Sequence, residues 1–425
     1  MRRVVVTGVG VVSPIGNGLP DFLEGLRTSR RGIGTIRSFD STSFSSRIAG
    51  EVKDLAMKEL ALPEEEGPAL LRDPKGLYGL AAAQEALRGA FGNGMPSACY
   101  GRDRMGLFMA AGLEIFNLAD LVAYVDGGSV LGEALQKSLD TAPAFSRLQI
   151  PAHLAARCIA RQVEAEGQFA VDVSACAAGT QAIGEAFWAI RDGAADMMVT
   201  GGYDSMVNPL GVGGFTLLQA LSTANELGGG ASRPFHAKRD GFVLGEGAAV
   251  IVLESLDGAR ARSAPILGEV LGFGSTMDAF RVTDPATDQR GAIGAMRNAL
   301  ADASISPEQV DYVNAHGTGT EKNDPAETAA IRAAFGAHAD ALPVSSTKSQ
   351  IGHLIGAAGA VEFVATLLAI EHGFLPATIN LDETDPECDL DYVPENVRDA
   401  NVNVAVSNSF GFGGQNACIV LSSGR

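Results

Sequence analysis

Strands and helices alternate through both halves of this 425-residue chain, and this alternation restricts its architecture more than any other feature. In the first half the pattern predicts strands over 3–9, 105–111 and 248–253, with an amphipathic helix over 77–91. The second half begins again at 266–274, where a strand also runs into glycines. Such alternation predicts an α/β protein with mostly parallel sheets covered by helices.

The composition limits the partners and the compartment that suit this chain. A net charge of −18 disfavours nucleic acid and anionic membranes as partners. The five cysteines are scattered without a CxxC pair, which favours a reducing cytoplasm over a disulfide framework or a zinc site. No signal peptide is expected, because Met1 lies almost directly before a strand. The longest apolar run, 351–370, contains His353 and Glu362 and therefore predicts a core helix, not a membrane span.

One cysteine lies where a predicted strand turns into a predicted helix. The alternation of Val171 and Val173 predicts the strand, and the spacing of Ile183 and Phe187 predicts the helix that follows Cys176. At a helix N-terminus the dipole favours the thiolate, which is the nucleophilic form of cysteine. A cysteine is also often a small buried hydrophobe, so this segment alone leaves both interpretations open.

Three polar motifs far downstream also fall at the ends of predicted elements. His316 lies in the loop 314–320, and Lys348 and His353 precede the long apolar helix. A glycine-rich turn over 407–416 precedes the final strand. Each motif alone fits a structural role. Together with Cys176, the two histidines indicate a catalytic group.

With these motifs the chain resembles the β-ketoacyl-acyl-carrier-protein synthases, condensing enzymes of the thiolase superfamily, and most closely the elongating synthase II type. The resemblance extends from 4–16 to the last strand. It implies a thiolase-like five-layer α-β-α-β-α sandwich of two pseudo-duplicated halves. Residues 1–255 would carry the nucleophilic cysteine, and residues 256–425 would carry both catalytic histidines.

The resemblance implies a decarboxylating Claisen condensation. Cys176 would take up an acyl group from a thioester, with the backbone N–H groups of Cys176 and Phe410 stabilising the oxyanion. His316 and His353 would donate N–H groups to the enolate left by malonyl decarboxylation. Thiolases carry a second cysteine in the turn 410–416, and this chain has none there. Initiating synthases have asparagine in place of the second histidine, so His353 also favours the elongating type.

The resemblance assigns further roles by position. Lys348 would act electrostatically with Glu327 as its partner, and Phe410 would gate access to the nucleophile. Glu114 to Gln149 departs from the pattern of the family. The residues expected to bind substrate are Thr318, Thr320 and Thr283, along the phosphopantetheine arm, and Leu113, near the end of the acyl chain.

The expected partner is an acyl carrier protein that carries acyl and malonyl groups on phosphopantetheine. Arg72 and Lys75 occupy the basic docking segment of the family. Family members are dimers, which implies a homodimer, with a heterodimer as the alternative. No organic cofactor is expected.

No metal is expected either. Asn314, Glu362 and Asn408 occupy positions where some relatives bind a monovalent cation, but three scattered oxygen donors are a weak basis for a metal site.

Three functions remain open from the sequence. The first is chain elongation in fatty acid synthesis, and the second is a ketosynthase of an aromatic polyketide or other specialised pathway. The third is a non-catalytic subunit that sets chain length, although such subunits lack the nucleophile and this chain has Cys176 with both histidines.

Overall fold

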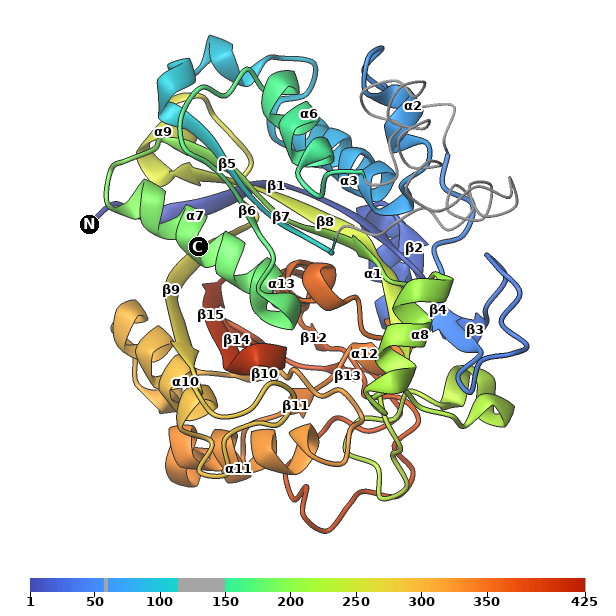
Figure 1. Cartoon of the computed structure of the whole chain (residues 1–425). Coiled ribbons are helices and arrows are strands. Elements are labelled where there is room, and N and C mark those ends of the chain that lie inside the picture. Colours follow the sequence, from blue (N-terminus) through green and yellow to red (C-terminus); the bar gives the residue numbers. More distant parts are fainter. Residues whose placement is uncertain (57–59, 114–149, 425) are drawn as a thin grey trace, which may run out of the picture.

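The computed structural model describes residues 1–56, 60–113 and 150–424. The expected departure from the family pattern at Glu114 to Gln149 therefore lies outside the described residues. Helices and strands alternate along the described chain. Most elements of the first half lie in the upper part of Figure 1 and most of the second half in the lower part, while α8 (Pro209–Leu217) lies at the right beside elements of the second half.

Among the described residues, five strands from each half of the chain follow an equivalent order in the sheet. The first half is ordered β1 (Val4–Ser13), β8 (Leu244–Ser255), β7 (Met197–Ser205), β5 (Met105–Ala111) and β6 (Phe169–Asp172). The second half is ordered β9 (Gly268–Met277), β15 (Gln415–Ser422), β14 (Val404–Gly411), β10 (Tyr312–Asn314) and β11 (Val344–Ser345). A short antiparallel pairing of β1 with β9 joins the two sets.

The prediction of mostly parallel sheets holds for strand direction, since four of these five strands in each half run the same way and only β8 and β15 run opposite, but it does not hold for every neighbouring pair. In each half the two outer pairs are parallel, as in β5 with β7 and with β6, whereas the two inner pairs are antiparallel, as in β8 with β1 and with β7. The second half repeats this: β14 and β15 form a hairpin through the glycine-rich turn, which requires an antiparallel pair. Element order along the chain does not reveal the direction in which each strand enters its sheet.

Helices form three layers around these strands (Figure 1). The outer helices α3 (Pro74–Phe91) and α6 (Leu154–Gln162) cover the first half, and α10 (Arg290–Ala303) and α11 (Asn323–Phe335) cover the second. Between the strands of the two halves lie α7 (Ala178–Arg191) and α13 (Ala358–His372), which contact each other. The expected five-layer α-β-α-β-α sandwich is confirmed.

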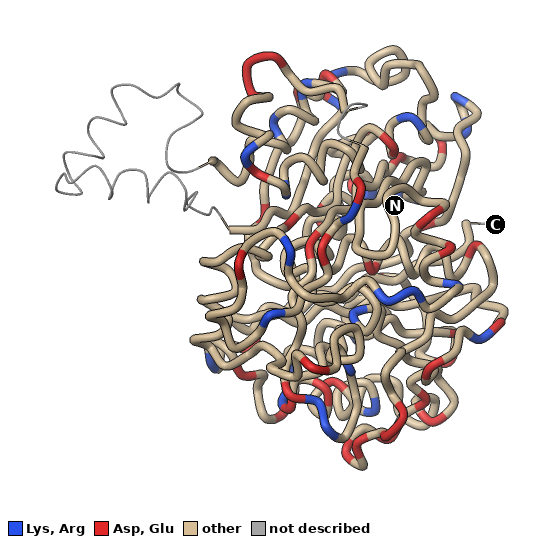
Figure 2. The backbone as a smooth tube through the Cα atoms, turned by 90° about the vertical axis from the view of Figure 1, so that its right-hand side faces the viewer, with Lys and Arg blue, Asp and Glu red and all other residues tan. Residues whose placement is uncertain are grey.

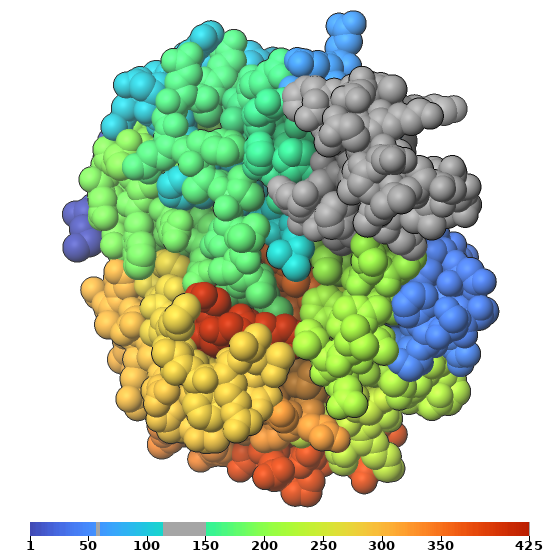
Figure 3. Space-filling model, in the orientation of Figure 1, coloured from blue at the N-terminus to red at the C-terminus, as the bar shows by residue number. Residues whose placement is uncertain are grey.

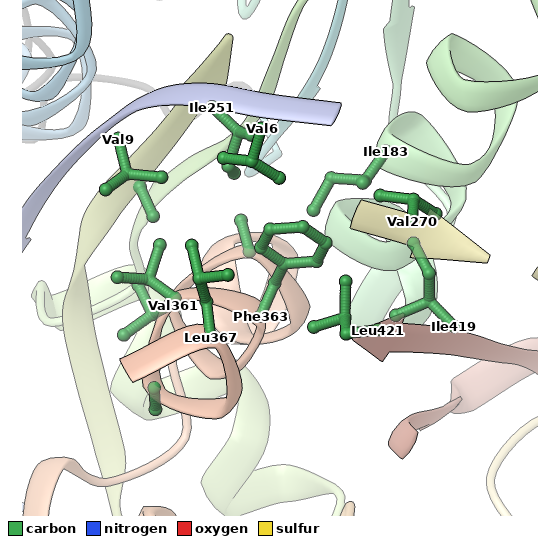
Figure 4. Packing of buried hydrophobic residues seen from close by; sticks show 14 of the residues in the cluster. Val6, Val9, Ile183, Ile251, Val270, Val361, Phe363, Leu367, Ile419 and Leu421 are labelled. Carbon is green, nitrogen blue, oxygen red and sulfur yellow. The ribbon is translucent and has the colours of Figure 1, made fainter. Parts of the chain in front are cut away.

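The central helix α13 is buried on almost every side, as an apolar helix without a polar face should be. Val361, Phe363 and Leu367 of this helix pack with Val6 and Ile251 of the first sheet (Figure 4). By length and composition the segment Ile355–His372 could cross a membrane, but 89% of it is buried inside the protein, as in a core helix.

The apolar run 351–370 is not one helix. It starts in α12 (Lys348–Ile351), turns through Gly352 and Ile355, which have φ angles of +77° and +46°, and resumes as α13. The remaining short elements are α1 (Leu19–Arg27), α2 (Gly67–Leu70), α8 (Pro209–Leu217), α9 (Leu256–Ala261), β2 (Gly16–Asn17), β3 (Ile33–Thr35), β4 (Ile48–Gly50), β12 (Phe374–Leu375) and β13 (Arg398–Asp399).

Candidate active site

Cys176 lies between β6 and α7, as the strand-to-helix pattern predicts. A single 3₁₀ turn over Ala175–Ala177 precedes the first residue of α7, and Ala175 has a φ of +54°. The small residues around the cysteine allow this sharp turn to pack closely against the second half. The side chain of Cys176 is buried, with 4% exposed.

Two histidines from the second half converge on this sulfur. The Cys176 Sγ atom and one ring nitrogen each of His316 and His353 all lie within 4.8 Å of one another. The two imidazole rings have centroids 5.2 Å apart and are nearly perpendicular, at 81°. His316 follows β10, and His353 lies between α12 and α13. Residues separated by 140 and 177 positions from Cys176 therefore form one cluster, because the two halves face each other across α7 and α13.

Both imidazoles are neutral N–H donors at physiological pH. Burial, followed by the nearby charge of Lys348, holds the pKa values of His316 and His353 well below the usual range. The backbone N–H of Ile355 donates to His353 Nδ1 at 3.2 Å, so the ring proton of His353 is on Nε2. A neutral imidazole in this tautomer can donate a hydrogen bond to an oxyanion.

The cysteine differs from the expectation of a thiolate favoured by the helix dipole. Burial raises the pKa of the Cys176 thiol to about 11, against the lowering effects of the Phe412 N–H and of the Lys348 charge. The resting form is therefore the thiol. The backbone N–H of Phe412 faces the sulfur, two residues beyond Phe410, whose N–H the resemblance assigned to the oxyanion.

Two cavities meet at Cys176. An apolar cavity of about 600 Å³ extends along α8 and is lined by Leu113, Met206, Phe215 and Cys176 itself. A smaller cavity of about 80 Å³, called the polar cavity because it is more polar than the first, is lined by Cys176 and both histidines. Its walls also include Thr283, Thr318, Thr320 and Phe410. An apolar chain in the first cavity and a polar arm in the second can thus both reach the Cys176 sulfur.

The glycine-rich turn after β14 forms part of the walls of both cavities. In Figure 3 the C-terminal segment (red) reaches the surface between the yellow segment near the end of β9 and the green segment of α8. The Phe410 ring lies 6.1 Å from the His316 ring, and Phe412 lines both cavities. This turn is therefore placed where its movement would change access to Cys176.

Comparison with known proteins decides the family. Residues 1–259 match the model "Beta-ketoacyl synthase, N-terminal domain", and residues 267–382 match "Beta-ketoacyl synthase, C-terminal domain". The chain belongs to the β-ketoacyl synthase family. The resemblance indicated by the motifs is thereby confirmed over nearly the whole chain.

Two curated relatives share one name. The synthase is 42% identical to "3-oxoacyl-[acyl-carrier-protein] synthase 2" of Synechocystis sp. over 424 residues, which cover 99% of this chain and 98% of the relative. It is 40% identical to the protein of that name from Coxiella burnetii, with the same coverage.

Among solved structures, the synthase resembles "The ishigamide ketosynthase/chain length factor" with a TM-score of 0.86, 34% identity and 99% coverage of both chains. It also resembles a β-ketoacyl synthase from Burkholderia phymatum with a TM-score of 0.84, 31% identity and full coverage of both chains.

The structure gives Lys348 a partner other than the expected one. Its ammonium group contacts the Glu362 carboxylate of α13, and both side chains are fully buried. Glu327 instead accepts the backbone N–H groups of His316 at 2.8 Å and Gly317 at 2.7 Å. Glu327 thus fixes the loop that carries His316, and the lysine charge is held by Glu362.

Oxygen atoms near this ion pair could hold a cation or water by their chemistry. Asn314 Oδ1, Asn408 Oδ1 and Glu362 Oε2 are buried and accept no hydrogen bond from the described residues. Cys176 and the two histidines are also ligand types that Zn²⁺ prefers. Membership of the β-ketoacyl synthase family favours a catalytic role, and not zinc binding, for Cys176, His316 and His353.

The position of Lys75 contradicts a role in docking. Its side chain is 4% exposed and forms an ion pair with Asp73 at 2.8 Å, so it is not available to a partner protein. Arg72 is half-buried.

Sequence reasoning missed the wall formed by α8 and by Asp204 of β7. The sequence feature that could have indicated the α8 wall is the uncharged run 206–218, which is rich in glycine and leucine.

Proposed function

We propose that the synthase catalyses the decarboxylating condensation of an acyl-enzyme with malonyl-acyl carrier protein, giving 3-oxoacyl-acyl carrier protein in fatty acid chain elongation. The observation that carries this proposal is the convergence of Cys176 with two neutral histidines where an apolar and a polar cavity meet.

In the first half-reaction the Cys176 sulfur attacks the thioester carbonyl of the acyl donor. We assign the stabilisation of the oxygen that becomes negative to the N–H groups of Cys176 and Phe412, a role supported by their position against the sulfur. The C–S bond to the donor breaks, and the thiol proton passes to the departing phosphopantetheine thiolate. The acyl chain then occupies the apolar cavity along α8, where water is excluded.

In the second half-reaction a malonyl thioester enters the polar cavity. The C–CO₂ bond breaks, and the electron pair forms an enolate whose oxygen accepts N–H bonds from His316 and His353. The enolate carbon attacks the acyl carbonyl, and the new C–C bond forms as Cys176 leaves as a thiolate. Neutral imidazoles suit this role because each can donate a hydrogen bond without first being charged.

The arm of the carrier is assigned to Thr283, Thr318 and Thr320. The hydroxyl groups of Thr318 and Thr320 lie 3.0 Å apart in the wall of the polar cavity. A solved relative, 33% identical with a TM-score of 0.84, is described as "AntDE:AntF (apo): type II PKS acyl-carrier protein in complex with its ketosynthase bound to the hexaketide". Acidic and basic residues are interspersed over the face shown in Figure 2, so this face would offer a carrier local cations and not a uniformly basic surface.

Two copies of the synthase are inferred to associate through β6. This strand pairs only with β5 among the described strands, and Phe169 and Val173 at its ends are 47% and 55% exposed. An open edge with apolar side chains is a template for pairing with a second copy. We further assign 1–255 and 256–425 to two equivalent halves, which their common strand order supports, and we place the synthase in the cytoplasm.

The test measures intact protein mass after the synthase is mixed with acyl-acyl carrier protein, followed by malonyl-acyl carrier protein and analysis of products. Retention of one acyl group by the parent but not by Cys176→Ala, then one two-carbon extension per malonyl unit, supports the proposal. Absence of acylation on Cys176 would indicate the non-catalytic subunit. Repeated condensation without reduction would favour a polyketide pathway, the second candidate supported by the ketosynthase neighbours.

A further inference from the structure

A buried carboxylate that the proposed reaction does not use lies in the wall of the apolar cavity. Asp204, near the end of β7, is 1% exposed and lines this cavity together with Cys176. Its carboxylate fills the space left by two glycines. A Cβ atom on Gly112 would lie 1.7 Å from Oδ1, and one on Gly356 would lie 3.2 Å from Oδ2.

The carboxylate holds the segment that carries His353. The backbone N–H of Gly356 donates to Asp204 Oδ2 at 2.8 Å, three residues after His353. Between them, Ile355 has a φ of +46°. A β-branched residue in the left-handed region is strained and persists only where surrounding contacts hold it.

The same strained residue fixes the imidazole. The N–H of Ile355 donates to His353 Nδ1, which leaves the Nε2 proton available to the site. Two consecutive backbone N–H groups thus hold this turn: that of Ile355 donates to His353, and that of Gly356 donates to Asp204. If Gly356 lost its acceptor, the turn could relax toward an unstrained conformation, and the Ile355 contact to His353 would move with it.

Burying this carboxylate is costly. Burial raises the pKa of Asp204 to about 7, and its Oδ1 atom accepts no hydrogen bond from the described residues. An apolar side chain would serve better if the position needed only to complete the wall of an acyl cavity. The bond to Gly356 is the interaction that such a side chain could not replace.

We propose that Asp204 is a positioning residue, which aims His353 at Cys176 by holding the strained turn 353–356 through the N–H of Gly356. The inference rests on the proposed function, since it concerns the step assigned to His353. Cys176 acylation does not require the His353 N–H in that scheme, so the two half-reactions should respond differently to changes at Asp204.

The experiment measures each half-reaction separately in the full-length synthase. Asp204→Ala removes the acceptor, whereas Asp204→Asn keeps an oxygen that can accept the Gly356 N–H. In Asp204→Ala, decarboxylation of malonyl-acyl carrier protein should fall roughly 10- to 100-fold, the loss typical of a small misplacement of a reacting group. Acylation of Cys176, followed by intact mass, should change by less than about threefold. Asp204→Asn should decarboxylate within about fivefold of the parent.

Ile355→Gly provides a second, independent variant. Glycine adopts a positive φ without strain, so this substitution should recover part of the decarboxylation rate when combined with Asp204→Ala. The inference would be overturned if Asp204→Ala decarboxylated malonyl-acyl carrier protein at the rate of the parent. It would also be overturned if the alanine and asparagine variants both lost acylation and decarboxylation to the same extent. If the alanine variant does not fold, loss of decarboxylation in a folded Asp204→Asn would overturn it. Failure of the parent itself to decarboxylate would instead reject the proposed function.

Discussion

The ion pair between Lys348 and Glu362 leads to a quantitative prediction. Both side chains are buried at the site, at 1% and 0% exposure, and no other carboxylate contacts the lysine among the described residues. Two opposite charges attract by about 4 kcal/mol at 4 Å in an effective dielectric constant of 20. Removing one partner of a buried pair destabilises a protein by about 3–5 kcal/mol, because the remaining charge is left uncompensated.

This cost converts to a small but measurable change in melting temperature. An unfolding entropy of about 2.1 cal/mol/K per residue gives about 0.9 kcal/mol/K for 425 residues. Lys348→Met should therefore lower the Tm by about 3–6 °C. The methionine keeps most of the volume of the lysine, so loss of the charge dominates.

The decrease in Tm caused by Lys348→Met should depend on pH, and its direction follows from the pKa of Glu362. Burial raises the pKa of Glu362 to about 7, above its ordinary value of 4.5. A carboxyl group whose pKa is raised by folding contributes stability that is fully present below its pKa in the unfolded chain. That contribution is lost as the pH rises through its pKa in the folded protein. Without the lysine this pKa rises further, so the carboxylate becomes costly above pH 7. The Tm difference should be near its full size at pH 8.5 and small at pH 5.5.

A double-mutant cycle identifies the partner. Calorimetry of Lys348→Met, Glu362→Gln and the double variant at pH 8.5 should give a coupling of about 2–3 kcal/mol. The matched control replaces Glu362→Gln by Glu327→Gln, and the coupling to Lys348→Met should be below about 0.5 kcal/mol. A stronger coupling to Glu327 would refute the assignment and favour the partner expected from the sequence.

Three further outcomes are expected. Alkylation of Cys176 by iodoacetamide should accelerate about tenfold per pH unit from pH 7 to 10, since the thiol pKa is about 11, whereas a plateau below pH 8 would contradict burial as the dominant effect. Gly214→Leu should shorten the longest acyl chain that Cys176 accepts by roughly two to four carbons, measured by intact mass. Gly214 lines the apolar cavity, and a Cβ atom there would meet no described atom within 4 Å, so the leucine side chain can occupy space in the cavity. An unchanged chain length would argue against this wall. Gly359→Ala should lower the Tm by about 2–3 °C, since its Cβ would lie 2.2 Å from Thr180 Oγ1, while the control Gly34→Ala, with no described atom within 4 Å, should not.

Local pattern was sufficient for many of the elements. The predicted strand 105–111 coincides with β5, and the strand-to-helix turn around Cys176 is present, because periodicity and small-residue turns act over a few neighbouring positions. Motif recognition likewise placed Cys176, His316 and His353 in one group, which the structure brings together.

The direction of each strand and the break before α13 could not be predicted from the sequence pattern. The antiparallel inner pairs become visible only in the assembled sheet. The break at Ile355 is held by two backbone N–H groups, that of Ile355 donating to His353 and that of Gly356 donating to Asp204. Neither is encoded by hydropathy along a single segment.

The sequence by itself determined the alternation of elements, the identity of the reactive groups and the family. Only the tertiary structure decided that Lys348 pairs with Glu362, that Lys75 is buried, that the Cys176 thiol is protonated and that an apolar and a polar cavity meet at its sulfur. The reason is that propensities depend on neighbours along the chain, whereas charge pairing, desolvation and cavity shape are sums over residues that only folding brings within a few ångströms.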